Sequence, residues 1–380
     1  MHLSRSIGFI HFFISLVLCL ASCHRGKTQA QEQPLHTDSI RYAKGFIVEH
    51  FEDYTSVKVR DPWDSTRLLQ HYLLVERDKK TPANLPKGTI VRTPVQRMVV
   101  YTSVHASAIE QLGEVNSIVG VCEARFIDSP TIQERIRQGL VSDLGESTAP
   151  NIERIMEIGT EALIASPFQN SSYGTAEKLG IPIIEGADYM ETLPLGRTEW
   201  IRFFGMLFEK TNVADSIFQA TEKRYLDLKK LVDEADLQRP KILVERKFGA
   251  SWFLPGGDSY IANLYKDAGA DYLFNDLAGG GSVPLAFEKV LERAIHADIW
   301  ILKYYQDRPL TYADLKAEYS PYAEFDAYTK QKIYACNTAT TPFYEDIPMH
   351  PDYLLKDMIQ IFHPQLMKKE PLRFYAPLAN

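Results

Sequence analysis

The stretch that decides the fold reads NVADSIFQATEKRYLDLKKLVDEAD and runs from Asn212 to Asp236. Apolar residues recur in it near the 3.6-residue spacing of an amphipathic helix, at Val213, Ile217, Phe218, Tyr225, Leu228, Leu231 and Val232. Asn212 can serve as the N-cap, with Asp215 in the first turn. About 24 residues at about 1.5 Å each would reach about 36 Å, roughly a domain diameter. We therefore expect one long helix that can join two lobes.

Strand and helix patterns alternate on both sides of this stretch. Before it, short apolar runs predict strands at 98–101, 118–121, 162–165 and 181–184, with helices at 106–112, 152–158 and 175–179. After it, strands are expected at 242–245, 299–302 and 333–336, with helices at 259–266, 287–296 and 353–362. Such alternation predicts parallel sheets. The expected fold class is α/β, with two Rossmann-like lobes joined by a long backbone helix.

The same patterns predict the domain boundaries. An alternating, strand-rich region from Arg41 to Thr93, punctuated by Pro and Gly, predicts antiparallel strands at the start of the first lobe. The expected segments are a signal peptide at 1–22, a flexible tether at 23–40, an N-terminal lobe at 41–195, a linking helix at 196–236 and a C-terminal lobe at 237–370. Two lobes leave a cleft between them, and parallel sheets bind ligands at the carboxyl ends of their strands.

The first residues have the pattern of a secretory signal peptide. Arg5 is followed by an apolar run over 7–20, too short to span a hydrocarbon core of about 30 Å comfortably. The run ends in Leu20-Ala21-Ser22-Cys23, which resembles the bacterial lipobox. The resemblance implies lipidation of Cys23 and a membrane-anchored lipoprotein in the periplasm or cell envelope, where several acyl chains give firm anchoring. The alternative is an ordinary signal peptide that happens to contain a cysteine.

Charge and cysteine usage exclude several classes of protein. The 380 residues include 42 Lys and Arg and 49 Asp and Glu, which gives a formal charge of −7. The sequence contains no run of basic residues that could bind along a phosphate backbone. Nucleic acid is therefore not an expected partner. Apart from Cys19 in the signal peptide and Cys23 at the lipobox, only Cys122 and Cys336 are present, so neither a disulfide scaffold nor a CxxC site is expected. A single bridge between these two is the alternative to two small buried side chains.

Several segments, in order and spacing, resemble the substrate-binding proteins of ABC importers for iron chelates and cobalamin, the class with a long helical hinge. They are PNIERI at 150–155, EALI at 161–164, LGIP at 179–182, WFLPGGD at 252–258, LYKDAGADYLF at 264–274 and PDYLLKD at 351–357. The similarity covers roughly residues 95–368. It implies a lipid-anchored protein that captures an iron chelate, either a siderophore or haem, in the interlobe cleft. It also implies delivery to a permease and its ATPase in the inner membrane, with cobalamin or another corrinoid as the alternative ligand.

The resemblance further implies one acidic docking residue on each lobe, facing basic residues of the permease. Glu153 matches the position on the first lobe. On the second lobe the matching position is Lys266, with Asp267 beside it, so Asp267 is the expected docking residue there. No resident cofactor is implied.

Candidate ligand contacts are expected where strands end, because those loops face the cleft. The principal candidates are Tyr101, His105, Arg125, Phe168, Trp252, Tyr260, Tyr304 and Tyr344, with Ser103, Glu123, Gln169, Lys247, Lys303 and Phe343 nearby. Aromatic residues outnumber cations, which favours a macrocycle or a neutral chelate over a strongly anionic one. His105 or Tyr101 could ligate haem iron, although a hydrogen-bonded structural role near the helix start is the favoured interpretation. The only local cluster suited to a bare metal is His350, Glu345 and Asp346, and no metal site is predicted from it.

Catalytic motifs are absent from the sequence. It contains no phosphate-binding GxxxxGK[ST] loop, no GxSxG elbow and no HExxH zinc helix. The expectation is a binding protein rather than an enzyme. A surface enzyme and a module that sequesters its ligand without feeding a permease remain the alternatives.

Overall fold

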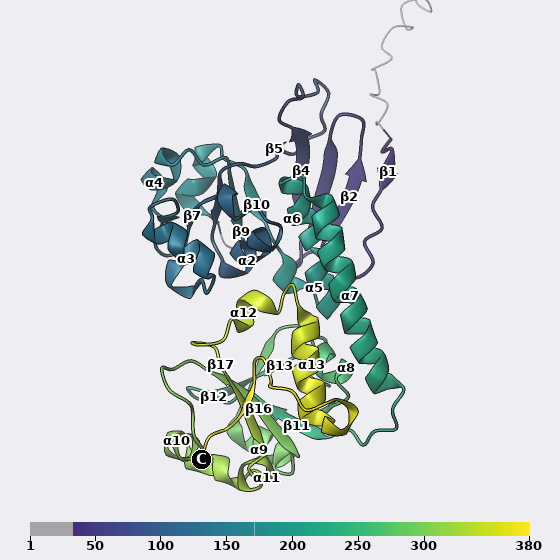
Figure 1. The fold of residues 1–380 in the computed structure, drawn as a ribbon, viewed down its shortest axis with the longest axis vertical. Helices are drawn as coiled ribbons and strands as arrows, with labels where there is room; N and C mark the ends of the chain where they lie inside the picture. The colour runs from purple at the N-terminus through teal and green to yellow at the C-terminus, as the bar shows by residue number, and fades with distance from the viewer. Residues whose placement is uncertain (1–32, 171) are drawn as a thin grey trace, which may run out of the picture.

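The computed structural model describes residues 33–170 and 172–380. Two lobes lie along the long axis of the molecule and are joined by α7 (Thr211–Asp233) (Figure 1). The predicted signal peptide, the lipidation site Cys23 and most of the predicted tether lie outside the described residues. Within the described part of the chain, no helix has the length and apolar character needed to cross a membrane.

The first lobe begins with a five-stranded sheet, as the strand-rich pattern predicts. Its strands, in spatial order, are β1 (His36–Thr37), β2 (Phe46–His50), β3 (Thr55–Arg60), β4 (Leu68–Glu76) and β5 (Thr89–Thr93). All neighbours pair antiparallel except β4 and β5, which are parallel. β1 lies inside the predicted tether and pairs with β2, so the folded lobe starts before residue 41.

A parallel sheet completes the first lobe. Its order is β10 (Ile183–Glu185), β9 (Ala162–Ala165), β6 (Met98–Val100), β7 (Ile118–Val121) and β8 (Ser142–Asp143). The main helices connecting these strands are α2 (Ser103–Gln111), α3 (Pro130–Arg137) and α4 (Ile152–Glu157). The central strands are buried along their whole length, because helices cover both faces of a parallel sheet.

The second lobe contains another mostly parallel sheet. Its order is β14 (Asp271–Tyr272), β11 (Lys241–Val244), β16 (Ile299–Tyr304), β17 (Ile333–Asn337) and β18 (Ala376–Pro377), with only β18 antiparallel. Its helices include α8 (Tyr260–Asp267), α9 (Phe287–Ala294), α10 (Tyr312–Glu318), α11 (Asp326–Thr329) and α13 (Pro351–Phe362). Because β18 belongs to this sheet, the second lobe extends beyond residue 370.

A small antiparallel sheet of the second lobe is not predicted from the sequence. It is formed by β12 (Lys247–Phe248), β13 (Ser251–Pro255) and β15 (Ser282–Leu285). The turn after β13 needs glycine, since a Cβ on Gly257 would lie 1.7 Å from the carbonyl oxygen of Asn275.

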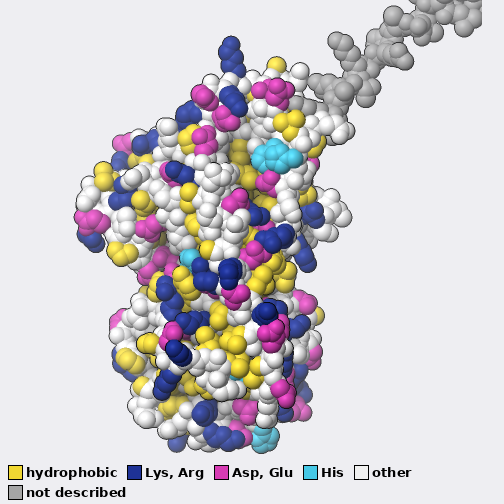
Figure 2. Space-filling model, turned by 45° about the vertical axis from the view of Figure 1, so that its right-hand side comes forward, with side chains coloured by type: hydrophobic (Ala, Val, Ile, Leu, Met, Phe, Trp, Pro, Cys, Tyr) yellow, Lys and Arg dark blue, Asp and Glu magenta, His cyan; other side chains and the backbone are white. Residues whose placement is uncertain are grey.

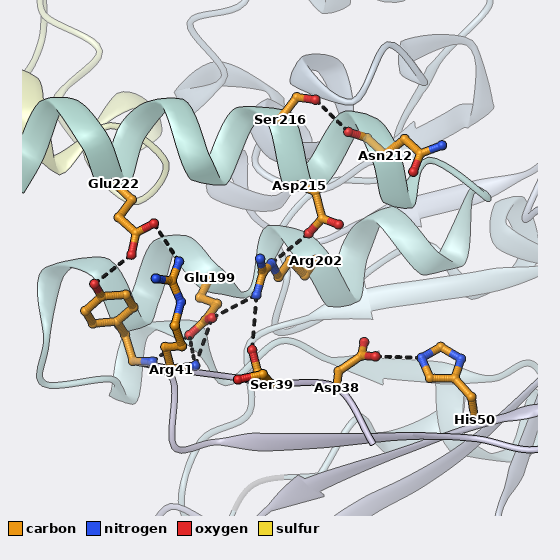
Figure 3. Close-up of polar contacts among 11 residues, drawn as sticks. Asp38, Ser39, Arg41, His50, Glu199, Arg202, Asn212, Asp215, Ser216 and Glu222 are labelled. Carbon is orange, nitrogen blue, oxygen red and sulfur yellow. Dashed lines mark hydrogen bonds and ion pairs between the residues drawn. The ribbon is translucent and has the colours of Figure 1, made fainter. Parts of the chain in front are cut away.

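The linking segment consists of three helices, α5 (Pro194–Glu199), α6 (Ile201–Leu207) and α7, instead of one continuous helix over 196–236. The N-cap of α7 is Lys210 and not the predicted Asn212. The carbonyl of Lys210 already accepts a hydrogen bond from the Ala214 amide, which places Asn212 inside the helix. There the Asn212 carbonyl accepts a hydrogen bond from the Ser216 hydroxyl at 2.8 Å (Figure 3).

Buried carboxylates fasten the start of the first lobe to the linking helices. The Glu199 carboxylate accepts backbone hydrogen bonds from Arg41, Tyr42 and Ala43 at 2.7 to 3.1 Å. On α7, Glu222 accepts a hydrogen bond from the Tyr42 hydroxyl at 2.7 Å and pairs with the Arg41 guanidinium (Figure 3). Charged acceptors at these positions satisfy backbone donors that would otherwise be buried without partners.

α7 contributes to the hydrophobic cores of both lobes. Ala214 and Phe218 pack in the core of the first lobe, and Tyr225 and Val232 pack in the core of the second. The Tyr225 hydroxyl also donates to the Asp267 carboxylate on α8 at 2.7 Å. Bending α7 would therefore open one core or the other, so the helix holds the two lobes at a fixed separation.

We expect Phe218→Ala to lower the free energy of unfolding by about 3 to 5 kcal/mol, because it leaves a cavity in a fully buried site. Leu226→Ala on the same helix is the matched control, since Leu226 is 42% exposed and should cost less than about 1 kcal/mol. Urea unfolding followed by circular dichroism measures both. Equal losses in the two variants would contradict the shared-core role of α7.

Candidate functional site

The two lobes contact each other beside the linking helices. The short helix α12 (Phe343–Asp346) of the second lobe packs against α2 of the first. The buried carboxylate of Glu345 accepts a hydrogen bond from the Asp128 amide at 2.9 Å. Nearby, the Thr198 hydroxyl donates to the Pro348 carbonyl at 2.9 Å. These contacts define a junction between the lobes at the carboxyl ends of both parallel sheets.

A pocket of about 180 Å³, here called the junction pocket, lies between the second lobe and α5 of the linking segment. It is lined by Arg197, Tyr260, Ile261, Lys303, Phe343, Tyr344, Ile347, Pro348 and Leu354. These residues come from α5, α8, β16, α12 and α13 and from the turn after α12. Tyr260 and Tyr344 were predicted ligand contacts, and Lys303 and Phe343 were considered with them, so the structure brings these four side chains together. On the face shown in Figure 2, hydrophobic side chains gather around the waist of the molecule, with Lys and Arg side chains among them.

A buried charge network holds one wall of the junction pocket. Asp188 is fully buried and accepts from Arg197 Nε at 2.9 Å and from His105 Nε2 at 3.0 Å. Burial alone would raise the pKa of Asp188, but the charge of Arg197 and the His105 hydrogen bond leave the pKa below its usual value. Arg197 is thereby fixed with its guanidinium carbon 5.8 Å from the centre of the Tyr260 ring. The network therefore holds the positively charged Arg197 side chain in a fixed position at the wall of the junction pocket.

His105 has the hydrogen-bonded structural role considered for it and is not placed to ligate haem iron. His105 is fully buried, and its second ring nitrogen, Nδ1, lies 2.9 Å from the Thr102 hydroxyl, so both nitrogens are engaged. A Cβ on Gly186 would lie 2.4 Å from His105 Nε2, which explains the glycine at that position. His105 acts on the pocket only through Asp188 and Arg197.

Lys303 supplies a second cation, and its charge is already paired. Its ammonium group forms an ion pair with Glu245, and it lies 5.6 Å from the centre of the Phe343 ring. Burial would lower the pKa of Lys303, but the adjacent Glu245 carboxylate leaves it above its usual value. Glu245 follows β11 with φ of 58°, a left-handed conformation that is uncommon for residues other than glycine. In the first lobe, Glu123 after β7 also has a left-handed conformation, with φ of 53°.

A second hollow of about 390 Å³ adjoins the junction pocket and shares Lys303 with it. Its lining is Glu245, Arg246, Lys247, Phe248, Gly249, Lys303 and Glu318. Arg246 pairs with Glu318, and Phe248 is 81% exposed. The two hollows together form a surface with aromatic rings and largely neutralised cations.

Trp252 and Tyr101 are core residues, which corrects their predicted role. Trp252 is fully buried in the middle of β13, its indole donates to the Val244 carbonyl at 3.0 Å, and its ring packs 5.7 Å from that of Trp300. The turn of this segment begins only after Pro255, so Trp252 lies within the strand and not in the loop that follows it. Tyr101 is 4% exposed and packs against Tyr173 in the first lobe.

The remaining predicted contacts do not line the junction pocket. Arg125, in the short 3-10 helix η2 (Ala124–Phe126), and Phe168, on a loop, are exposed on the first lobe, and Arg125 pairs with Glu146 at 3.1 Å. Tyr304 lines a different hollow, of about 410 Å³, beside β17 and β18. Arg197 was not predicted, because no pattern in the sequence distinguishes an arginine on a short helix from a surface arginine.

The cluster of His350, Glu345 and Asp346 does not converge on one point. Glu345 accepts from the Asp128 amide, while Asp346 pairs with Arg373 at 2.6 Å. Cys122 and Cys336 are both buried and free, as the prediction of two small buried side chains requires.

The family described as periplasmic binding protein matches residues 98–340, a span that contains the parallel sheet of the first lobe, α7 and every strand of the second-lobe sheet except β18. The chain belongs to the periplasmic binding protein family. A curated relative, an uncharacterized lipoprotein of Methanocaldococcus jannaschii, is 23% identical over 364 residues, which cover 89% of this chain and 85% of the relative.

Solved structures share the fold of this periplasmic binding protein. A possible iron-binding (periplasmic solute-binding) protein from Staphylococcus epidermidis is 15% identical with a TM-score of 0.58, and the match covers 71% of this chain and all (100%) of that one. A periplasmic haem-binding protein from Pseudomonas aeruginosa is 14% identical with a TM-score of 0.58 and covers 75% and 98% of the two chains. The expected fold class of two α/β lobes joined by a long helix is confirmed.

The two predicted docking residues of the periplasmic binding protein differ in accessibility. Glu153 is exposed in the first turn of α4. Asp267 is engaged instead, because its carboxylate accepts from Tyr225 on α7 and pairs with Lys229 at 2.5 Å. Asp267 therefore ties α8 to the linking helix and is not a free acidic group on the surface, which corrects the prediction.

The junction between the lobes should respond to pH through Glu345. Burial raises the pKa of Glu345 from its ordinary value of 4.5 to about 7 and is the largest cause of the shift. The nearby carboxylates of Asp128, Asp346 and Glu110 raise it further. Between these two values the folded protein binds more protons than the unfolded chain, so the stability contributed by Glu345 falls as pH rises through that window. Glu345→Gln cannot ionise, yet its amide oxygen can still accept from Asp128. We expect it to raise the free energy of unfolding near pH 8 by about 1 to 3 kcal/mol.

Urea unfolding of wild type and Glu345→Gln, repeated at intervals between about pH 5 and about pH 8, measures this effect. The control is Glu153→Gln, which removes an exposed carboxylate on α4. Parallel profiles for wild type and Glu345→Gln would show that Glu345 does not titrate in this range.

Proposed function

We propose that this periplasmic binding protein is the substrate-binding component of an ABC importer. In this proposal it captures an iron chelate, haem or a siderophore complex, at the junction pocket and delivers it to a membrane permease. The observation that carries the proposal is the convergence of Tyr260, Phe343 and Tyr344 with Arg197 and Lys303 where the second lobe meets α5 of the linking segment. Aromatic walls with a few fixed polar anchors suit a flat or macrocyclic ligand.

The size of the pocket determines how such a ligand would sit. Its volume of about 180 Å³ is below the roughly 300–1,000 Å³ of typical ligand pockets. A macrocycle would therefore insert one edge and extend over the adjoining hollow that shares Lys303. The rings of Tyr344 and Phe248 can cover the faces of the macrocycle in this position. Tyr344 is 57% exposed and Phe248 is 81% exposed. Covering these rings on binding would remove apolar surface from water.

The charges at the site favour a weakly anionic ligand. Each cation that lines the junction pocket has a carboxylate partner, Arg197 with Asp188 and Lys303 with Glu245. A highly anionic siderophore complex would need several unpaired arginines or lysines. This balance supports haem or a near-neutral ferric chelate, and a corrinoid is the alternative ligand.

The comparisons support the class of ligand and the location. Two solved relatives carry names that include iron-binding and haem-binding, and the curated relative is named a lipoprotein. We propose that Cys23 carries a lipid anchor and that the protein acts in the cell envelope. We further propose that Glu153 contacts basic residues of the permease.

Ligand binding is tested by titrating the purified full chain with haemin, a ferric hydroxamate siderophore and cyanocobalamin in separate calorimetric experiments. We expect one iron chelate to bind in a 1:1 complex, and Tyr344→Ala to weaken it at least about tenfold, a loss of about 1.4 kcal/mol. Tyr305→Ala is the matched control, because Tyr305 is 66% exposed but does not line the junction pocket.

The outcomes separate the alternatives. Binding of cyanocobalamin alone would replace the iron chelate with a corrinoid. If Tyr344→Ala and Tyr305→Ala weaken binding equally, the ligand does not bind in the junction pocket. No binding by any of the three compounds would contradict the proposed function.

Docking is tested by charge reversal at Glu153. We expect Glu153→Lys to leave ligand affinity unchanged and to reduce ligand uptake at least about tenfold in cells that carry the importer, because it places a cation opposite basic residues. Glu134→Lys on α3, another exposed glutamate of the first lobe, should retain uptake. Equal uptake by both variants would exclude Glu153 from the docking surface.

A further inference from the structure

A second cluster of polar side chains lies far from the junction pocket, in the first sheet. His36 on β1, Asp38 and His50 at the end of β2 direct their side chains to one point. His50 Nε2 is 2.9 Å and His36 Nε2 is 3.5 Å from the same oxygen, Asp38 Oδ1. The two imidazole rings stack with their centres 4.1 Å apart. Figure 2 shows histidine side chains together near the start of the described chain, and Figure 3 shows Asp38 directed toward His50.

Strand pairing holds these side chains in place. His36 lies directly opposite His50 in the antiparallel register of β1 and β2. Backbone hydrogen bonds from Leu35 to His50 at 2.7 Å and from Asp38 to Val48 at 3.0 Å close the ladder on both sides. The three side chains are therefore presented by a backbone that is already ordered, as a metal site requires.

The donor set matches a borderline transition-metal ion. Two imidazole nitrogens and a carboxylate oxygen, all within 4.8 Å of one another, suit Zn²⁺ and its first-row neighbours better than Mg²⁺ or Ca²⁺, which prefer oxygen ligands alone. The Thr55 hydroxyl lies 3.2 Å from His50 Nδ1. An Nδ1–H donated to Thr55 would leave the Nε2 lone pair of His50 facing Asp38, which is the tautomer that a metal ion needs.

The surroundings leave room for a cation and further ligands. The cluster borders a hollow of about 380 Å³ whose opposite wall comes from α6 and α7. The cation on that wall, Arg202, pairs with Glu199 at 3.1 Å and with Asp215 at 2.8 Å (Figure 3). Its charge is thus compensated, and Asp38 and Asp215 give the hollow a negative balance that favours a divalent ion.

We propose that His36, Asp38 and His50 bind one Zn²⁺-class divalent ion, with the remaining coordination positions open to the hollow. The ion would link β1 to β2 and so fix the first strand of the folded lobe. This site is separate from the junction pocket and does not depend on the ligand that the junction pocket binds.

The test is calorimetric titration of the purified full chain with Zn²⁺ alone, with Co²⁺ absorption as a second readout of coordination. We expect one site in wild type, and His36→Ala and His50→Ala to weaken it at least about tenfold. His296→Ala is the matched control, because His296 is also exposed and paired with an aspartate, Asp326, but lies in the second lobe. Mg²⁺ should not compete at equal concentration.

Folding of the variants is checked by circular dichroism. If His50→Ala unfolds, His36→Ala decides the result, since the His36 side chain is 62% exposed on a two-residue strand. Unchanged Zn²⁺ binding in folded His36→Ala, or loss of binding only in His296→Ala, would overturn the proposal. Loss of binding in the two sheet variants with unchanged haemin titration would support it independently of the proposed transport function.

Discussion

The rest of the structure depends on the packing of one helix into two hydrophobic cores. The first half of α7 buries Phe218 against the first lobe, and the second half buries Tyr225 and Val232 against the second. A continuous helix cannot bend sharply at any residue without breaking backbone hydrogen bonds. The lobes are therefore held at one separation, and the space between the carboxyl ends of their sheets is set by the helix before any ligand binds.

Buried carboxylates hold the side chains of the site in fixed positions on this rigid frame. Asp188 and Glu345 each sit where the lobes or their helices meet, and each is satisfied by hydrogen bonds from donors of other elements. A buried polar group is costly unless it is hydrogen-bonded, so these groups restrict the positions of their partners. Through Asp188 the position of Arg197 is fixed, and through Glu245 that of Lys303. The pocket thus has prearranged cations, and most of the ordering cost is met during folding instead of on ligand binding.

The two proposed sites use the linking segment in different ways. The junction pocket takes Arg197 from α5, whereas the histidine cluster faces Arg202 on α6 and Asp215 on α7 across a separate hollow. The same stretch of helices therefore lines a pocket of the second lobe and a hollow at the edge of the first sheet. Glu199 and Glu222 connect the two regions, because both hold the chain segment at Arg41 and Tyr42 that follows the cluster.

The sequence by itself determined the features that arise from local periodicity. The strands at 118–121 and 162–165 have the predicted bounds, because strands buried on both faces read as continuous apolar runs. The 3.6-residue period of α7 and the order of motifs were enough to predict two α/β lobes and the family. The aromatic and basic candidates Tyr260, Tyr344, Lys303 and Phe343 follow from the rule that strand ends face the cleft.

Only the tertiary structure decided which polar and aromatic side chains are accessible. Trp252 and His105 have the residue types of a ligand site, yet long-range packing buries them in the cores. Asp267 is paired by residues of α7 that lie about forty positions away in the chain. His36 and His50 meet through antiparallel strand pairing, which no local pattern encodes. Burial and pairing depend on which distant segments come into contact, and for that reason the folded chain, and not its periodicity, defines the site.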